Sequence, residues 1–128
     1  MSSGVVIDAS AALAYVFEER GGGRVPDALD GAAISAVNWA EVVEKAISAD
    51  VDDRSLRTAF EGLGAIVLPV DAEHSEYAAR LRKKTKGLGL SLADRFCFAL
   101  AASRNAPVMT ADRAWAKVDV GVEVLLIR

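Results

Sequence analysis

The chain lacks the features that would mark a secreted, membrane-embedded or nucleic-acid-coating protein. Its 128 residues include a single cysteine, so no internal disulfide can form. It has no charged-then-apolar leader and no apolar run of about 18 residues, the length that a membrane-spanning helix needs. A net charge of -3 and a pI near 5.1 argue against a general nucleic-acid coat protein, whose domains are usually strongly basic. We therefore expect a cytoplasmic protein with no membrane partner.

Several catalytic signatures are also missing. The glycines of Gly21-Gly22-Gly23-Arg24 are not followed by the Lys and Ser or Thr of a phosphate-binding loop, and no G-x-S-x-G nucleophile elbow occurs. The lone thiol, Cys97, lies in an apolar stretch, where free cysteine packs as a small hydrophobe. Zinc is disfavoured, because Cys97 and His74 are the only sulfur or imidazole ligands in the chain. What the chain does have is carboxylates in unusual places.

Composition and pattern predict one α/β domain over residues 1–128. With 52% hydrophobic and 26% charged residues, the chain has an ordinary globular composition, and its length suits a single core. Short apolar runs, typical of strands buried on both faces, alternate with stretches of helical composition. Such alternation predicts a parallel sheet flanked by helices on both faces. We expect strands at residues 4–8, 32–35, 65–70, 107–110 and 122–127, helices at 10–20, 36–48, 54–61, 71–86 and 92–104, and a flexible surface turn at the glycines 21–23.

Four acidic residues stand where charge is costly or where strands end. Asp8 closes an apolar run, and Asp112 follows the fourth predicted strand. Asp94 lies in a helix that is otherwise almost wholly apolar, and Glu41 lies in the first turns of another helix. In open parallel sheets, functional groups gather at the carboxyl ends of the strands, which the N-termini of the following helices also face. We therefore expect all four carboxylates to lie along one rim of the sheet.

Asp8 and Asp112 each have a structural explanation as well. Asp is a good N-cap, so Asp8 can cap the following helix; Ser10 can also do so, which would free Asp8 for another role. Asp112 follows Thr110-Ala111, and Asp is a common turn residue. Taken singly, neither residue identifies a site.

Glu41 and Asp94 are open to the same alternative. Glu41 stands three residues after Asn38, the spacing of a capping pair, and Ser91 with Asp94 matches a capping box. An ionised carboxylate is nevertheless costly to bury without a cation or donors, which favours a functional role for Asp94 in its apolar helix. Independent caps would not need to fall on one rim, so the four acids together favour a shared site.

A cluster of carboxylates suits a hard divalent cation. Mg²⁺ and Mn²⁺ prefer oxygen ligands and retain several waters. Such a metal can activate a water, orient a phosphodiester and stabilise the leaving oxyanion. The sequence therefore predicts a Mg²⁺ or Mn²⁺ cofactor rather than zinc.

A basic stretch in this acidic chain has two interpretations. Cations at the end of a helix complement its macrodipole. The same cations, next to an acidic rim, can contact phosphates and position a nucleic acid without reading its sequence. This candidate RNA-binding stretch consists of Arg80, Arg82, Lys83, Lys84 and Lys86.

The four acids lie in four short segments of the chain: Val6-Ile7-Asp8-Ala9-Ser10, Ile34-Ser35-Ala36-Val37-Asn38-Trp39-Ala40-Glu41-Val42, Leu90-Ser91-Leu92-Ala93-Asp94 and Thr110-Ala111-Asp112-Arg113-Ala114-Trp115. In order and spacing, these segments resemble the motifs of the PIN-domain family, and specifically the VapC-type toxins of bacterial and archaeal toxin–antitoxin pairs. The resemblance covers nearly the whole chain, and no acidic motif position is lost. Trp39, Arg95 and Phe96 differ from the residues usual in the family, so contacts with RNA or antitoxin are expected to differ.

The resemblance implies a PIN-like fold with a five-stranded parallel sheet and an endoribonuclease that depends on Mg²⁺ or Mn²⁺. It also implies a homodimer, held inactive by a cognate antitoxin protein that inserts into the active-site groove. Polar neighbours would orient the ligands, as they do in metal sites generally. The implied catalytic and metal-binding residues are Asp8, Glu41, Asp94 and Asp112, supported by Ser10, Asn38 and Thr110.

The leading hypothesis is thus an RNA-cleaving toxin. One alternative is a non-catalytic protein-binding module of the same fold, in which the acids serve only as caps. Another is a metal-dependent phosphatase or DNA nuclease that uses the same rim.

Overall fold

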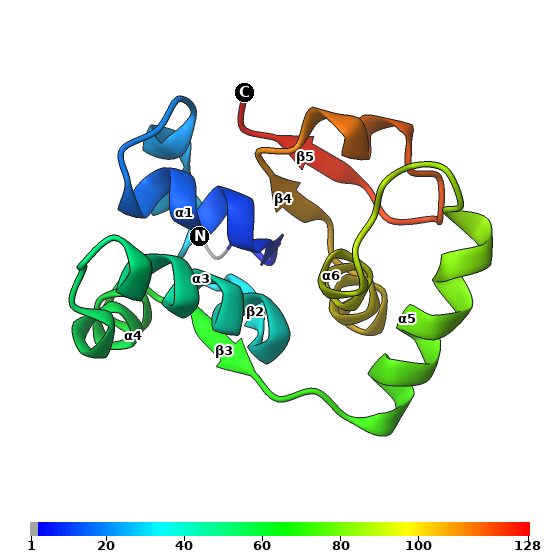
Figure 1. Cartoon of the computed structure of the whole chain (residues 1–128), viewed down its shortest axis with the longest axis horizontal. Coiled ribbons are helices and arrows are strands. Elements are labelled where there is room, and N and C mark those ends of the chain that lie inside the picture. The colour runs from blue at the N-terminus through cyan, green and yellow to red at the C-terminus, as the bar shows by residue number, and fades with distance from the viewer. Residues whose placement is uncertain (1–2) are drawn as a thin grey trace.

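The computed structural model, which describes residues 3–128, is a five-stranded parallel sheet between two layers of helices (Figure 1), which confirms the predicted fold class. The strand order is β3-β2-β1-β4-β5, and every neighbouring pair is parallel. Strand order reverses at the central strand β1, so its carboxyl end marks the place where such sheets usually carry their functional groups. The strands are β1 (Val6–Ile7), β2 (Ala33–Ser35), β3 (Ile66–Leu68), β4 (Val108–Thr110) and β5 (Val124–Leu126).

The helices divide into two groups. In Figure 1, α1, α3 and α4 lie on one side of the diagonal band of strands, and α5 and α6 lie on the other. Two short 3-10 helices, η1 and η2, occupy the connections after α1 and after β4. The helices are α1 (Ala9–Val16), η1 (Gly22–Arg24), α2 (Val25–Ala28), α3 (Ala36–Ser48), α4 (Asp53–Gly62), α5 (Ala72–Lys84), α6 (Leu92–Arg104) and η2 (Arg113–Lys117).

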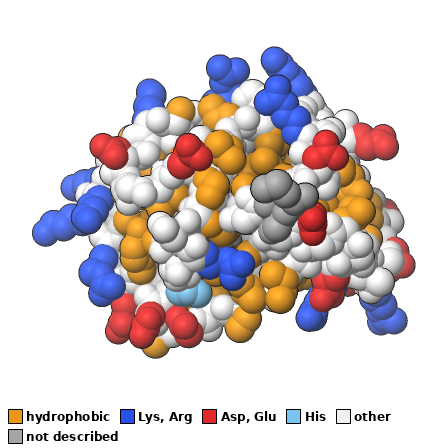
Figure 2. Space-filling model, turned by 180° about the vertical axis from the view of Figure 1, so that it is seen from behind, with side chains coloured by type: hydrophobic (Ala, Val, Ile, Leu, Met, Phe, Trp, Pro, Cys, Tyr) orange, Lys and Arg blue, Asp and Glu red, His pale blue; other side chains and the backbone are white. Residues whose placement is uncertain are grey.

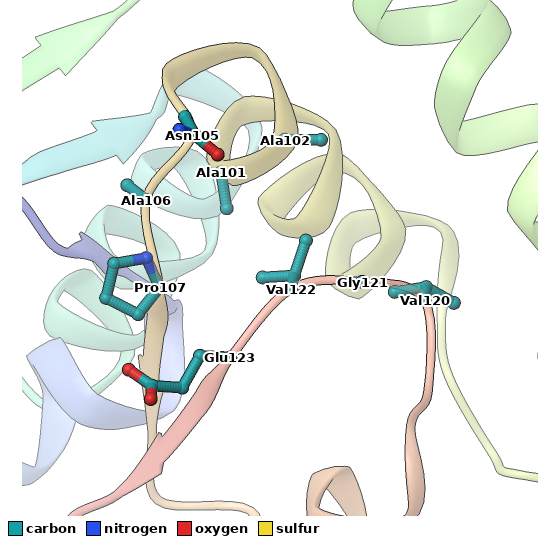
Figure 3. A pocket seen from close by; sticks show the side chains of 9 residues that line it. All are labelled: Ala101, Ala102, Asn105, Ala106, Pro107, Val120, Gly121, Val122 and Glu123. Carbon is teal, nitrogen blue, oxygen red and sulfur yellow. The ribbon is translucent and has the colours of Figure 1, made fainter.

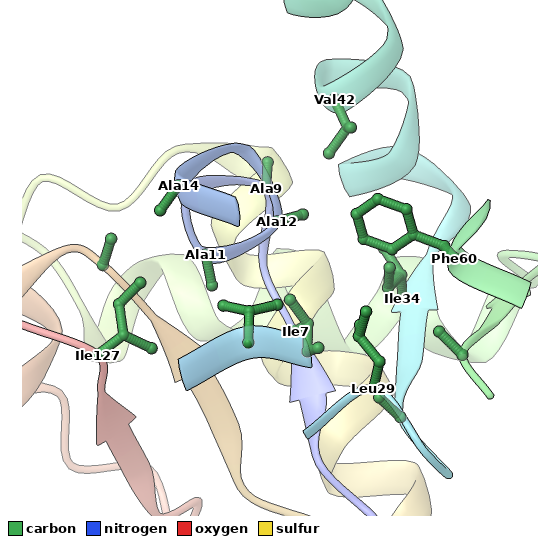
Figure 4. Close-up of a cluster of buried hydrophobic side chains, with 14 of the residues drawn as sticks. Ile7, Ala9, Ala11, Ala12, Ala14, Leu29, Ile34, Val42, Phe60 and Ile127 are labelled. Carbon is green, nitrogen blue, oxygen red and sulfur yellow. The ribbon is translucent and has the colours of Figure 1, made fainter. Parts of the chain in front are cut away.

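Each face of the sheet has its own hydrophobic core. Successive side chains of a strand point to opposite faces, so neighbours in β1 are buried in different clusters. Ile7 packs with Phe60 and the small alanines of α1 (Figure 4), whereas Val6 packs with Phe98 and Trp115 on the side of α5 and α6. Burial of β1 on both faces explains why its sequence is a continuous apolar run.

The segment after α1 corrects two predictions. The helix ends at Val16 rather than near residue 20, and the glycines that follow are not a flexible surface turn. Gly22 is buried, and a Cβ there would collide with the carbonyl oxygen of Ala14. Gly21 has a φ of 85°, and a Cβ there would collide with the carbonyl oxygen of Ile127. The glycines therefore let this segment approach both α1 and the last strand.

The surface of the molecule carries mixed charge. On the face shown in Figure 2, basic and acidic side chains are interspersed and hydrophobic side chains lie between them. None of the helices in the described part of the chain is long and apolar enough to cross a membrane.

Candidate functional site

Asp8 follows β1 directly, and its carboxylate is almost completely buried, at 3% exposure. The backbone N–H of Ala11 donates to Oδ1 at 2.8 Å, which makes Asp8 the N-cap of α1. The hydroxyl of Thr110 donates to Oδ2 at 2.7 Å, and the hydroxyl oxygen of Ser10 lies 2.9 Å from both carboxylate oxygens. The prediction that Ser10 could take over the cap is wrong, because the helix already includes Ala9. Asp8 both caps α1 and faces the end of β4.

Burial raises the pKa of Asp8 to about 6 from its usual 3.8. The hydrogen bonds from Ala11, Thr110 and Ser10 act in the opposite direction, and the charge of Asp94 raises the pKa further. Desolvation of the carboxylate therefore outweighs the donors that the protein supplies.

Ser10 and Thr110 join the ends of β1 and β4. Their hydroxyl oxygens lie 3.1 Å apart. The N–H of Ala111 donates to the Ser10 hydroxyl at 2.9 Å, and the N–H of Asp112 donates to the Thr110 hydroxyl at 3.0 Å. Two predicted supporting residues thus link the buried Asp8 to the chain that carries Asp112.

Asn38 holds Glu41 from within α3. Its Nδ2 donates to Oε1 of Glu41 at 3.4 Å and to the carbonyl oxygen of Ala93 at 3.0 Å, which ties α3 to α6. The predicted capping role of this pair is wrong, because α3 begins at Ala36 with Ser35 as its N-cap. Asn38 is 1% exposed, and its buried Oδ1 accepts no hydrogen bond from any residue that the structure describes. A buried acceptor without a partner is costly, so this oxygen is suited to a water or cation.

Asp94 lies in the first turn of α6 and forms the predicted capping box. The N–H of Ser91 donates to its Oδ2 at 3.0 Å, and its own N–H donates to the Ser91 hydroxyl at 3.1 Å. Its Oδ1 accepts no hydrogen bond from residues 3–128. The next residue, Arg95, turns away and donates to the carbonyl oxygen of Ala78 at 2.9 Å. Capping thus uses one of the two oxygens of Asp94.

Asp112 is the exposed N-cap of η2. Its Oδ1 accepts a hydrogen bond of 3.0 Å from the N–H of Ala114, so the turn role predicted for it is present. It lies just beyond the carboxyl end of β4, as expected from the sequence.

The four carboxylates share one electrostatic environment with Asp94 at its centre. Burial is the main reason why the pKa of Glu41 and that of Asp94 are raised. The charge of Asp94 raises the pKa of both Asp8 and Glu41, and the charge of Asp112 raises the pKa of Asp94. Because such repulsion falls with distance, the fold has brought the acids to one rim, here called the acidic rim.

The acidic rim is not a preassembled metal cage. Within residues 3–128, no three His, Cys, Asp or Glu side chains come close enough together to hold a metal ion. The donors nevertheless have the right chemistry, since the rim offers carboxylate oxygens and the unpaired amide oxygen of Asn38, which hard cations prefer. Side-chain rotations toward a common point would be needed, and the roles of the four acids as ligands stay predictions.

Members of the basic stretch line several depressions, and their role in binding RNA stays a prediction. Arg82, Lys86 and the buried Arg95 line a hollow beside the start of α6, whereas Arg80 lines a different depression that it shares with Glu73. From the sequence, Arg95 stood out only as a departure from the residues usual in the family that the chain resembles. The signal that it mattered was a cation within an otherwise apolar helical segment.

Another hollow lies far from the acids, at the amino ends of β4 and β5 (Figure 3). Its volume is about 410 Å³, and its one ionisable lining residue is Glu123. Most of its other lining side chains are small or apolar, including Ala101, Pro107 and Val122. It contains none of the groups that the acidic rim brings together.

Comparison with known proteins relates the chain to one family. Residues 5–121 match the family model described as "PIN domain". No protein of curated function matches the chain significantly.

Solved structures give the same relationship. A toxin–antitoxin complex from Klebsiella pneumoniae matches with a TM-score of 0.78 at 21% identity, over 97% of this chain and 98% of that one. DNA-bound VapBC from Salmonella typhimurium matches with a TM-score of 0.73 at 18% identity, over 97% and 98%. VapBC-5 from Mycobacterium tuberculosis, a member of the VapBC family of toxin–antitoxin systems, matches with a TM-score of 0.60 at 26% identity, over 95% and 97%.

Proposed function

Since the chain belongs to the PIN-domain family, we propose that it is a metal-dependent endoribonuclease and the toxin of a VapBC-type toxin–antitoxin pair. The acidic rim is the observation that supports this most directly, because it brings Asp8, Glu41 and Asp112 near Asp94 in a fold similar to that of toxin–antitoxin proteins. Such a rim is costly for an apo protein, since the carboxylates repel one another and three of them are partly or wholly desolvated.

Each acid has a distinct part in the proposed reaction. Asp8, Asp94 and Asp112 would hold Mg²⁺ or Mn²⁺ directly or through water, and Glu41 would complete the cluster. When bound, the cation lowers the pKa of a water and balances charge on the phosphodiester. Glu41 would also help position the attacking water.

The supporting residues keep these oxygens in place. Ser10 and Thr110 fix the buried carboxylate of Asp8 against the end of β4. Asn38 fixes Glu41 and at the same time ties α3 to α6, so that Glu41 and Asp94 keep their relative positions. Neighbours that orient ligands in this way strongly affect metal affinity.

The remaining parts of the proposal concern partners and location. We propose a homodimer in the cytoplasm whose acidic rim is blocked by a cognate antitoxin protein. The structural relatives support an antitoxin partner, since they include a toxin–antitoxin complex and members of VapBC systems. Size-exclusion chromatography with light scattering, with and without the co-expressed antitoxin, measures both assemblies.

The test of activity is cleavage of single-stranded RNA by the purified, antitoxin-free protein with Mg²⁺ or Mn²⁺. We expect wild type to cleave and the Asp8→Asn and Asp94→Asn variants to lose nearly all activity. A variant with the same change of charge elsewhere, Asp119→Asn at an exposed position before β5, is the control and should cleave like wild type. Equal activity of wild type and Asp8→Asn would disprove the catalytic assignment.

A non-catalytic module is the second candidate, because Asp8, Asp94 and Asp112 all cap helices. It predicts no heat of Mg²⁺ binding in calorimetry and a loss of thermal stability when an acid is neutralised. The proposed enzyme should instead show a heat of Mg²⁺ binding, and its metal-free form should gain thermal stability when an acid is neutralised. Parallel assays on DNA and on a phosphomonoester separate the ribonuclease from a DNA nuclease or phosphatase.

A further inference from the structure

A hollow on the far side of the first turn of α6 contains three cations and no carboxylate. It has a volume of about 580 Å³ and lies between the end of α5, the following loop and the start of α6. The hollow is therefore locally positive in a chain whose net charge is -3. Its lining residues are Arg82, Thr85, Lys86, Gly87, Gly89, Leu90 and Arg95.

Arg95 is the residue that makes this hollow more than a patch of surface lysine and arginine. It is 8% exposed, and no Asp or Glu within residues 3–128 forms a salt bridge with it. Its Nη1 donates to the carbonyl oxygen of Ala78, but its buried Nε has no hydrogen-bond partner among the described residues. Asp94, its neighbour in α6, interacts with it only through the longer-range charge effect. A buried guanidinium with an unused donor is expensive unless an anion compensates it.

The loop leaves room for such an anion. Gly87 and Gly89 both have positive φ, at 84° and 73°, and a Cβ at either position would meet nothing within 4 Å. The space above these glycines is therefore open rather than filled by packing. Arg82 and Lys86 are exposed and reach this space from the end of α5 and from the loop.

We propose that this hollow, here called the cationic hollow, binds one backbone phosphate of the RNA strand that crosses the acidic rim. This inference rests on the proposed ribonuclease function. The loop that lines the hollow continues from Leu90 through Ser91 into Asp94, so the two sites adjoin across the first turn of α6. Without a metal, the acids repel the phosphodiester of an RNA strand that crosses the acidic rim. Binding of a neighbouring phosphate of the same strand by the cations of the hollow would offset that repulsion.

A phosphate fits the donor set better than a carboxylate does. The guanidinium of Arg95 is a planar fork of donors whose buried Nε–H has no partner, and Arg82 and Lys86 line the same hollow. Three converging cations suit a tetrahedral group with several charged oxygens, whereas one carboxylate is already satisfied by one arginine. Within the basic stretch, Arg82 and Lys86 line this hollow, whereas Arg80 lines a depression with two glutamates. Lys83 lines another depression, together with Arg82 and Lys86.

The test uses a fluorescein-labelled single-stranded oligoribonucleotide and the full protein in EDTA, so that binding is measured without cleavage. The double variant Arg82→Gln/Lys86→Gln changes only exposed side chains and should fold normally. We expect fluorescence anisotropy to show binding at least about tenfold weaker, with a salt dependence shallower by about 0.7 for one lost phosphate. The control is Arg104→Gln, about 14 Å from Arg95 along α6, which should stay within about twofold of wild type.

Arg95 is probed without substitution, because removing a buried side chain risks unfolding. The Nε–H resonance of Arg95 in ¹⁵N-labelled wild type should shift on RNA addition, and saturate at the concentration that saturates anisotropy. An unmoved Nε resonance, or a double variant that binds RNA like Arg104→Gln, would overturn the proposal. A shift caused by a glutamate-rich peptide but not by RNA would overturn it too, in favour of an acidic protein segment.

These results are separable from the ribonuclease assay. Wild type that binds RNA through the cationic hollow but leaves it intact with Mg²⁺ or Mn²⁺ would refute the proposed function alone. Wild type that cleaves RNA while the double variant binds RNA with unchanged affinity would refute the cationic hollow alone.

Discussion

Replacing Asp8 with Asn should stabilise the metal-free protein at neutral pH and lose that advantage in acid. The carboxyl has a pKa of about 6 in the folded protein against 3.8 as its usual value. Between these values the folded state binds more protons than the unfolded state, so the free energy of unfolding falls as pH rises through this window. Above pH 6, the ionised Asp8 lowers the free energy of unfolding by the full amount, and the difference between the two pKa values corresponds to about 3 kcal/mol.

The Asn side chain keeps part of what Asp8 does. Its Oδ1 can still accept from the N–H of Ala11, and Asn is as good an N-cap as Asp. Its Nδ2 replaces the oxygen that accepts from Thr110, so that hydroxyl must turn, at a cost of about 1 kcal/mol. Near pH 7.5, the free energy of unfolding of Asp8→Asn should therefore exceed that of wild type by about 1 to 2 kcal/mol, which corresponds to about 3 to 8 °C in Tm for a domain of this size.

Urea unfolding followed by circular dichroism in EDTA, at pH 4, 5.5 and 7.5, measures this difference. We expect Asp8→Asn to be the more stable protein at pH 7.5 and the less stable one at pH 4, where Asp8 is protonated in the folded state. Saturating Mg²⁺ should stabilise wild type more than the variant, because only wild type keeps the full ligand set. A variant that is less stable than wild type at pH 7.5, or a difference that does not change with pH, would refute the reasoning.

Three further predictions concern packing and positioning. Gly22→Ala should lower the free energy of unfolding by at least about 2 kcal/mol in urea titrations, because the added Cβ collides with the backbone of Ala14. Gly23→Ala is the control and should change the free energy of unfolding by less than about 1 kcal/mol, because its Cβ meets nothing within 4 Å. Equal effects of the two substitutions would contradict the packing described. Asn38→Ala should lower the free energy of unfolding by about 1 to 2 kcal/mol and slow RNA cleavage, because it removes the hydrogen bonds to Glu41 and to the carbonyl oxygen of Ala93 in α6. Unchanged stability and cleavage would show that these contacts are dispensable. Burial and nearby carboxylates raise the pKa of the Cys97 thiol, so Cys97 should react with Ellman's reagent at pH 8 only when the protein unfolds. Prompt labelling of the native protein would contradict the burial of Cys97.

The order of elements and most boundaries could be predicted from local pattern. The predicted strand at residues 107–110 agrees with β4 to within one residue, and the predicted helix at residues 92–104 matches α6, because burial on both faces and the Ser91 cap leave clear marks in the sequence. The helix at residues 36–48 was also placed correctly, although Ser35 rather than Asn38 supplies its cap. The end of α1 was missed, because the glycines that follow it are there for close backbone contact and not for flexibility.

The candidate site was predictable in its residues but not in its arrangement. A charge inside an apolar segment is costly wherever the chain folds, so Asp8 and Asp94 stood out without coordinates. The first residue of a helix can be predicted from a sequence pattern only to within a residue or two. For this reason, the sequence did not decide whether Asp8 caps α1 or whether Asn38 caps α3.

By itself, the sequence determined that strands and helices alternate, that four carboxylates fall at strand ends and early helical turns, and that no sulfur or imidazole cluster competes for a metal. These properties follow from burial and spacing along the chain, which are local. The tertiary structure alone decided that β1 lies beside β4, so that Ser10 meets Thr110, and that Asp94 is the acid the others surround. It also turned Arg95 toward Arg82 and Lys86 and away from Asp94, because the direction of a helical side chain depends on which face of the helix is buried.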